Sequence, residues 1–111
     1  MVAIFRAHKG RKMLVIRKKK GEVLVLVLDG QMDTLCAVEQ GPEFDEALNE
    51  CTTLLLDMEK VSFLSSAGIR CILQVAKRAE DEGKTFQLTG LQPLVRKTLD
   101  IAGVLPLVTV V

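Results

Sequence analysis

The sequence predicts a single α/β domain on a mixed β-sheet, with an N-terminal antiparallel hairpin and helices packed mainly on one face. Three observations lead to this prediction. The 111 residues and a hydrophobic fraction of 49% are enough for one packed core. The unbroken apolar run at 23–28 is typical of a strand in the middle of a covered sheet. Beyond it, helical and extended segments alternate, which indicates crossover connections between parallel strands.

The hairpin comes first along the chain. Residues 13–17 are apolar and β-prone, residues 18–22 read as a polar turn, and the strand at 23–28 ends at Asp29-Gly30. Hydrophobic residues therefore flank a short polar segment, as in two antiparallel strands joined by a turn.

The N-terminal charge is one-sided. Residues 1–20 hold eight basic residues and no acidic ones, whereas residues 21–111 hold seven basic and fourteen acidic residues. A basic arm can attract nucleic acid or anionic lipid. We interpret residues 1–11 instead as a basic arm or edge strand whose lysines oppose aggregation, and we expect no direct contact with nucleic acid.

The next segment is predicted to be an imperfect helix. Pro42 suits the first turn of a helix and disrupts a helix interior. We therefore expect a regular helix at 42–49, with an irregular or single-turn lead-in from Thr34.

A second buried strand at 53–57 and a short connection at 58–64 precede the clearest helix. Its apolar residues recur at i, i+3, i+4 and i+7, which makes one stripe for packing on a sheet, and Gly83 is a natural stop after it. The stripe consists of Ile69, Ile72, Leu73 and Ala76.

The last third of the chain completes the alternation. We expect a short strand at 86–89, a third helix at 92–102 and a final apolar strand at 105–111. Pro93 near the start of that helix and Gly103 just past its end fit the usual asymmetry of helix termini.

Several chemistries find little support. Gly83-Lys84-Thr85 lacks the earlier glycine and the strand-to-helix setting of a phosphate-binding loop. No serine or cysteine has a base in view, so we expect no enzyme and no cofactor. The lone His8 and three cysteines without a CxxC pattern give no metal site and no disulfide framework. The carboxylates at strand ends read as caps and turn residues; they are Asp29, Asp33 and Asp57.

Ser65 and Ser66 stand at the start of the amphipathic helix. Serine is a good N-cap, because its hydroxyl accepts a hydrogen bond from a free backbone N–H. A helix N-terminus also accommodates a phosphate, through its free amides and its dipole. From the residues alone, capping and phosphorylation both remain open.

These residues lie in a recognisable stretch. The sequence VSFLSSAGI at 61–69, preceded by LLLD at 54–57, resembles the signature of the STAS family. That family comprises the anti-sigma-factor antagonists and the cytoplasmic domains of sulphate transporters. The GQMD sequence at 30–33 resembles the turn after the family's central strand, and the segments 86–91 and 99–104 resemble its last strand, helix and exit.

The resemblance covers roughly residues 12–110 and implies a cytoplasmic regulatory domain in signal transduction and transcription regulation. In the family's antagonists, the unmodified form binds an anti-sigma factor that is also a serine kinase, which frees the sigma factor. The kinase phosphorylates the serine at the helix start, and a phosphatase restores binding. Carried over, the phosphoacceptor is Ser66, with Ser65 as second candidate. The implied partner-binding residues are Asp33, Ser65, Ser66, Ala67, Gly68 and Ile69.

One departure leaves an alternative open. The family usually has Asp where this chain has Ser65, which favours an unswitched STAS scaffold in a larger signalling or membrane-linked assembly. A homodimer also stays open. We expect no membrane insertion, because the apolar run at 23–28 is far too short to span a bilayer. Residues 1–20 lack the uninterrupted apolar segment of a secretion signal.

Overall fold

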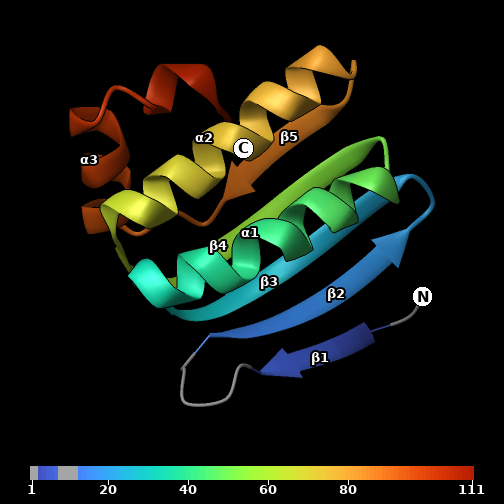
Figure 1. Cartoon of the computed structure of the whole chain (residues 1–111), viewed down its shortest axis with the longest axis horizontal. Helices are drawn as coiled ribbons and strands as arrows, with labels where there is room; N and C mark the ends of the chain where they lie inside the picture. The colour runs from blue at the N-terminus through green and yellow to red at the C-terminus, as the bar shows by residue number, and fades with distance from the viewer. Residues whose placement is uncertain (1–2, 8–12) are drawn as a thin grey trace.

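The computed structural model describes residues 3–7 and 13–111, with side chains from residue 13 onward (Figure 1). Its strands form one sheet in the order β1-β2-β3-β4-β5-β6. The first three strands pair antiparallel and the last four pair parallel, so the predicted mixed sheet with an N-terminal hairpin is confirmed. The strands are β1 (Ala3–Ala7), β2 (Leu14–Lys20), β3 (Val23–Met32), β4 (Thr53–Leu64), β5 (Thr85–Thr89) and β6 (Thr109–Val110).

The helices connect the parallel strands. They are α1 (Thr34–Asn49), α2 (Ser66–Asp81) and α3 (Pro93–Ile101), followed by the short 3-10 helix η1 (Leu105–Leu107). Each crossover leads to the next strand in the same direction, so right-handed connections place all of them on one face of the sheet. Figure 1 shows α1 and α2 crossing in front of the strands. Across the described part of the chain, no helix has the length and apolar character to span a membrane.

The core lies between the sheet and this helical layer. Alternate residues of β3 and β4 are buried toward the helices, as the two-residue period of a strand requires. Phe44 and Leu48 of α1 and Ile72 of α2 meet them with no exposed surface. The buried strand residues include Leu24, Leu26, Leu28, Leu54 and Leu56.

The hairpin strands are longer than the sequence predicts. β2 continues to Lys20, where a polar turn was expected, because Lys18, Lys19 and Lys20 pair with β3. Only Gly21 and Glu22 remain for the turn, and Gly21 takes the left-handed backbone conformation that a tight turn needs, with φ 61°. At the outer edge, β1 pairs with β2, whereas His8 and the rest of 8–12 lie outside the described residues.

The prediction for α1 was wrong. A single helix runs through Pro42, with no irregular lead-in. Pro42 is exposed, and buried residues lie on both sides of it, Cys36 and Ala37 before and Phe44 after. Packing of both halves on the sheet outweighs the hydrogen bond that proline removes, since tertiary burial supplies most helix stability in proteins.

Two strand predictions also need correction. The expected connection at 58–64 is the second half of β4, because Met58, Val61 and Leu64 are buried and the strand follows β3 through two register shifts. The expected strand at 105–111 is η1 followed by the two-residue β6. Pro106 lies within η1 and has no N–H to donate to a ladder.

Candidate functional site

The two serines at the start of α2 have different roles. Ser65 is the N-cap: its hydroxyl accepts a hydrogen bond from the backbone N–H of Gly68 at 3.1 Å. The backbone N–H of Ser65 donates to the carbonyl of Met32 at 2.9 Å. Ser66 is the first residue of the helix, and its side chain is exposed. The capping function therefore falls to Ser65, and the hydroxyl open to solvent belongs to Ser66.

Gly68 lets the first turn of α2 approach the end of β3. A Cβ at this position would lie 2.9 Å from Cδ1 of Leu64 and 3.1 Å from the carbonyl oxygen of Met32. The end of the Leu64 side chain can move, but a contact of 3.1 Å with a backbone oxygen is tighter than nine in ten real Cβ contacts, so a larger residue would crowd the strand. The glycine thereby fixes the position of Ser65 and Ser66.

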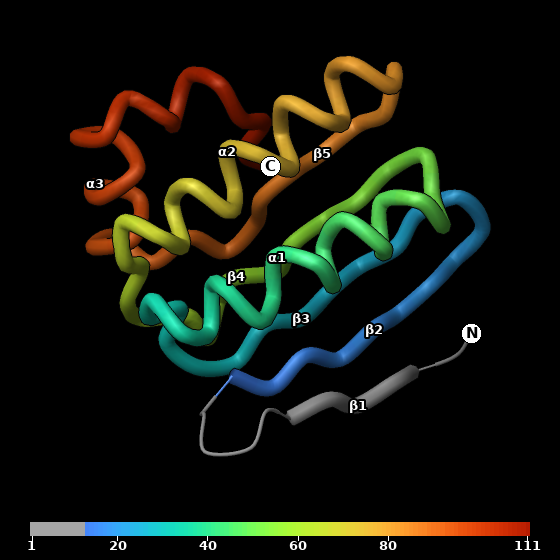
Figure 2. The backbone as a smooth tube through the Cα atoms, in the orientation of Figure 1, coloured from blue at the N-terminus to red at the C-terminus, as the bar shows by residue number. Residues whose placement is uncertain are grey.

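Asp33 caps the neighbouring helix. Its Oδ1 accepts a hydrogen bond from the backbone N–H of Cys36 at 2.9 Å. Because β3 and β4 are adjacent parallel strands, α1 and α2 begin at the same end of the sheet, as Figure 2 shows. The starts of the two helices thus lie at the same end of the sheet, with the Asp33 carboxylate at the start of α1 and Ser66 at the start of α2.

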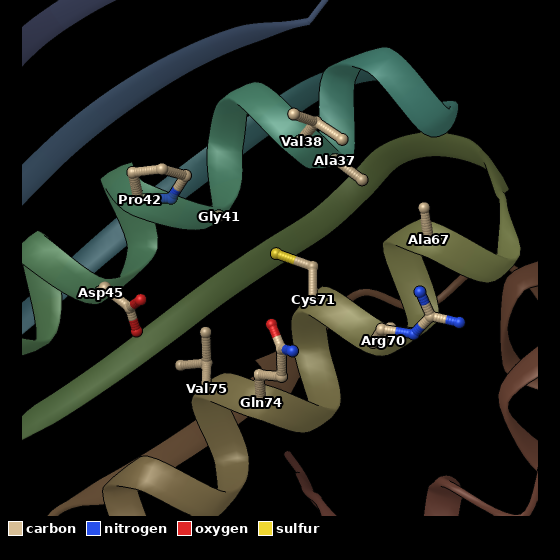
Figure 3. A pocket seen from close by; sticks show the side chains of 10 residues that line it. All are labelled: Ala37, Val38, Gly41, Pro42, Asp45, Ala67, Arg70, Cys71, Gln74 and Val75. Atoms are coloured by element: carbon tan, nitrogen blue, oxygen red, sulfur yellow. The ribbon is translucent and has the colours of Figure 1, made fainter.

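A groove of about 280 Å³ separates α1 from α2 (Figure 3). Its α1 wall includes Gly41 and Pro42, where small side chains leave the space open, and a Cβ on Gly41 would lie 3.8 Å from Sγ of Cys71. Arg70 and Asp45 give the groove one charge of each sign. Ala67 lines the same groove, so it continues from the start of α2.

The cysteine in this groove is buried, and its surroundings favour the neutral thiol. Burial raises the pKa of the Cys71 thiol from 9.0 to about 11, and the nearby carboxylate of Asp45 adds to the rise. Burial likewise raises the pKa of Cys51, whose thiol donates to the carbonyl of Ala47 at 3.3 Å. All three cysteines are free thiols. Within residues 3–7 and 13–111, no cluster of His, Cys, Asp and Glu suits a metal ion.

The structure brings most of the sequence-predicted site residues together. Asp33, Ser65 and Ser66 lie at the α1–α2 end of the sheet, and Ala67 and Gly68 follow in the first turn of α2. Ile69 differs, because it is partly buried and packs against the core.

Sequence reasoning missed three exposed apolar side chains in this part of the chain. Leu35 and Val38 on α1 are 46% and 64% exposed, and Phe63 of β4 is 45% exposed. Val38 also lines the groove. Their signal was hidden because 34–41 was expected to be irregular and 58–64 a connection. The available clue was the apolar run at 35–38, which lies outside the helix expected at 42–49.

Comparison with known proteins identifies the family of this chain. Residues 15–111 match the model of the STAS domain. An anti-sigma F factor antagonist of Paenibacillus polymyxa is 26% identical over 83 residues, which cover 73% of this chain and 71% of the relative.

Two solved structures share the fold. The Bacillus cell fate determinant SpoIIAA in its phosphorylated form is 21% identical, with a TM-score of 0.69 over 87% of this chain and 90% of that one. An anti-sigma factor antagonist from Mycobacterium paratuberculosis is 17% identical, with a TM-score of 0.78 over 88% and 84% of the two chains.

Proposed function

The chain belongs to the STAS domain family, and we propose that it is an anti-sigma-factor antagonist controlled by phosphorylation of Ser66. In this proposal, the α1–α2 end of the cytoplasmic protein binds an anti-sigma factor and so releases a sigma factor. The anti-sigma factor is also the kinase that modifies Ser66, and a phosphatase reverses the modification. The protein itself binds and does not catalyse.

The observation that supports the proposal most strongly is that the two serines have different roles: Ser65 caps α2, and Ser66 exposes its hydroxyl. Ser65 occupies the position of the family's usual Asp and caps α2 through Gly68, as a carboxylate there would. The replacement of Asp by Ser therefore keeps the local geometry. Ser66 keeps an exposed hydroxyl at the first helical position, where a kinase can reach it.

A phosphate on Ser66 would be tolerated by the folded protein. The helix N-terminus stabilises an adjacent anion by roughly 0.3–1 kcal/mol at an exposed position. Modification would thus change the surface without unfolding the domain.

The same phosphate would oppose partner docking. Leu35 and Val38 are exposed apolar side chains on the first turns of α1, and Val38 lines the groove between the two helices. A partner that covers them must exclude water from this end of the molecule. A phosphoserine adds a charge of about −1.5 to −2, which must then be desolvated and which repels carboxylates of the partner.

Binding measurements with two substitutions at one position test the proposal. We expect Ser66→Asp to weaken binding to the host's anti-sigma factor at least about tenfold, because it places a charge on the docking surface. We expect Ser66→Ala to bind as the unmodified protein does. Each purified anti-sigma factor of the host is titrated by calorimetry with both variants.

Ser65→Asp is the matched control, since it adds the same charge one residue earlier but restores the family's capping residue. We expect it to retain binding. Equal affinity of Ser66→Asp and Ser66→Ala for a partner that binds would contradict the switch and favour the unswitched scaffold.

A further inference from the structure

The sheet has a second face that no helix of residues 13–111 covers. All the crossovers lie on one side, so the opposite side of β2 to β5 is formed by the strands alone. Sheets made only of parallel strands are almost always covered on both faces, whereas antiparallel sheets can leave one face to solvent. Four of the strands here pair parallel, and the chain's own helices cover only one face of them.

The centre of this uncovered face is apolar. Strand alternation directs Leu24, Leu26 and Leu28 toward the helices and the intervening valines away from them. Val23 is 37% exposed, and the apolar residues around it are also partly exposed, whereas their helix-side neighbours are almost fully buried. The apolar residues on this face are Leu14, Ile16, Val23, Val25, Val27 and Leu55.

Charges of opposite sign stand at opposite corners of this apolar centre. In one row across the sheet, Lys18 of β2 pairs with Val25, which pairs with Leu55. In the next row on the same face, Ile16 pairs with Val27, which pairs with Asp57. Lys18 and Asp57 are therefore diagonal to each other across a block of four apolar side chains.

Further charges extend the same pattern. Lys20 lies beyond Lys18 on this face, and Asp29 lies at the far end of β3. Asp29 registers with the exposed Lys60, which offsets its charge, so Asp57 is the main acidic corner. The face is thus basic at one corner and acidic at the other.

We propose that a second copy of this chain covers the face, in a two-fold symmetric dimer packed sheet on sheet. In a two-fold interface, each contact occurs twice, with the residues exchanged between the copies. An axis between the two corners sets Lys18 of each copy against Asp57 of the partner subunit and stacks the apolar blocks on each other. Because the same face carries both charges, a second copy of the chain pairs with both of them at once, and no other molecule is needed.

The molecule is broad enough along the sheet for an interface of ordinary size. The molecule measures 33 × 32 × 21 Å, and the sheet lies across its two long dimensions. A specific interface needs about 800 Å² from each partner. The dimer leaves the α1–α2 end free, so it is independent of the switch proposed for Ser66.

Sedimentation of two charge-reversal variants tests the pairing. In a dimer of Lys18→Glu, each new glutamate faces Asp57 of the partner subunit; in a dimer of Asp57→Lys, each new lysine faces a Lys18. Each variant alone is expected to dimerise roughly tenfold more weakly than the unaltered chain. A mixture of the two restores both attractive pairs, so we expect heterodimers at near the unaltered affinity.

A second pair of variants tests the apolar centre. Val25→Glu, at the middle of the face, is expected to give a monomer that remains folded by circular dichroism. Ile101→Glu, at the end of α3 and 76% exposed in the unaltered chain, is expected to leave the dimer intact. A monomeric unaltered chain at every concentration, or a mixture no more dimeric than its components, would overturn the proposal.

Discussion

Removal of one hydroxyl at a time from Ser65 and Ser66 gives two neighbouring variants with opposite expectations. Ser65→Ala deletes the hydrogen bond to the N–H of Gly68, which is the side-chain cap of α2. Ser66→Ala deletes an exposed hydroxyl at the first helical position. The two substitutions remove the same atom and differ by one place in the sequence.

The magnitudes follow from the capping geometry. Loss of a serine N-cap costs about 1 kcal/mol, within a range of roughly 0.5–2 kcal/mol. For a domain of this size, that loss lowers Tm by roughly 4 °C. An exposed position without such a bond changes stability by less than about 0.5 kcal/mol, and alanine slightly favours the helix. Ser65→Asp is expected to restore stability, since Asp caps as well as Ser.

The assay is urea denaturation followed by far-ultraviolet circular dichroism, because the chain contains no Trp and no Tyr for fluorescence. The free energy of unfolding is compared for Ser65→Ala, Ser66→Ala and Ser65→Asp. Equal losses for the two alanine variants, or no recovery with Ser65→Asp, would refute the assignment of Ser65 as the cap.

Three further changes probe the packing around the site. Gly68→Ala is expected to lower the free energy of unfolding by about 1–3 kcal/mol, because its Cβ would crowd Met32; stability equal to that of the unaltered chain in urea would contradict this close approach. Gln40 is fully buried and its amide has no hydrogen-bond partner among the described residues, so Gln40→Leu is expected to raise the unfolding free energy by about 1 kcal/mol, and a lower urea midpoint would count against it. Burial raises the pKa of Cys71 from 9.0 to about 11, so the folded state favours the neutral thiol. The resulting contribution to the free energy of unfolding is fully present below pH 9.0 and is lost as the pH rises toward 11. That loss is about 2–3 kcal/mol, and a Cys71→Ala variant with the same alkaline decline would disprove this origin.

The sequence predicted elements best where a regular period matches the burial. The predicted helix at α2 packs one side on the core, but its buried stripe is shifted from the predicted one. Ile72 is fully buried, whereas Ile69, Leu73 and Ala76 are only partly buried; the other buried residues are Gly68, Cys71, Val75 and Ala79. Gly83 ends that helix in the left-handed conformation, with φ 68°. The apolar period and the terminal glycine both depend on neighbouring residues only, so both can be recognised in a single sequence.

The errors arose where tertiary contacts decide the local structure. Pro42 predicts a break, but burial on both sides of it keeps α1 continuous. In β4, the buried Met58, Val61 and Leu64 are three residues apart, because the strand shifts register against β3. A spacing of three does not indicate a strand, so the segment was expected to be a connection.

The candidate site was predictable in position but not in roles. The motif at 61–69 placed the site at the start of α2, and Asp33 joined it through the neighbouring parallel strand. Ser65 and Ser66 are equally good caps by residue type. Only the bond to Gly68 distinguishes them, and that bond depends on where the helix begins.

Phosphosite mapping by mass spectrometry tests the central claim most directly. The purified chain is incubated with ATP and a lysate of its native host, with Ser66→Ala treated in parallel. We predict phosphate on Ser66, none on Ser65 and none on the Ser66→Ala variant. Phosphate on Ser65, or none at all while the host kinase modifies a control substrate, would contradict the proposed switch.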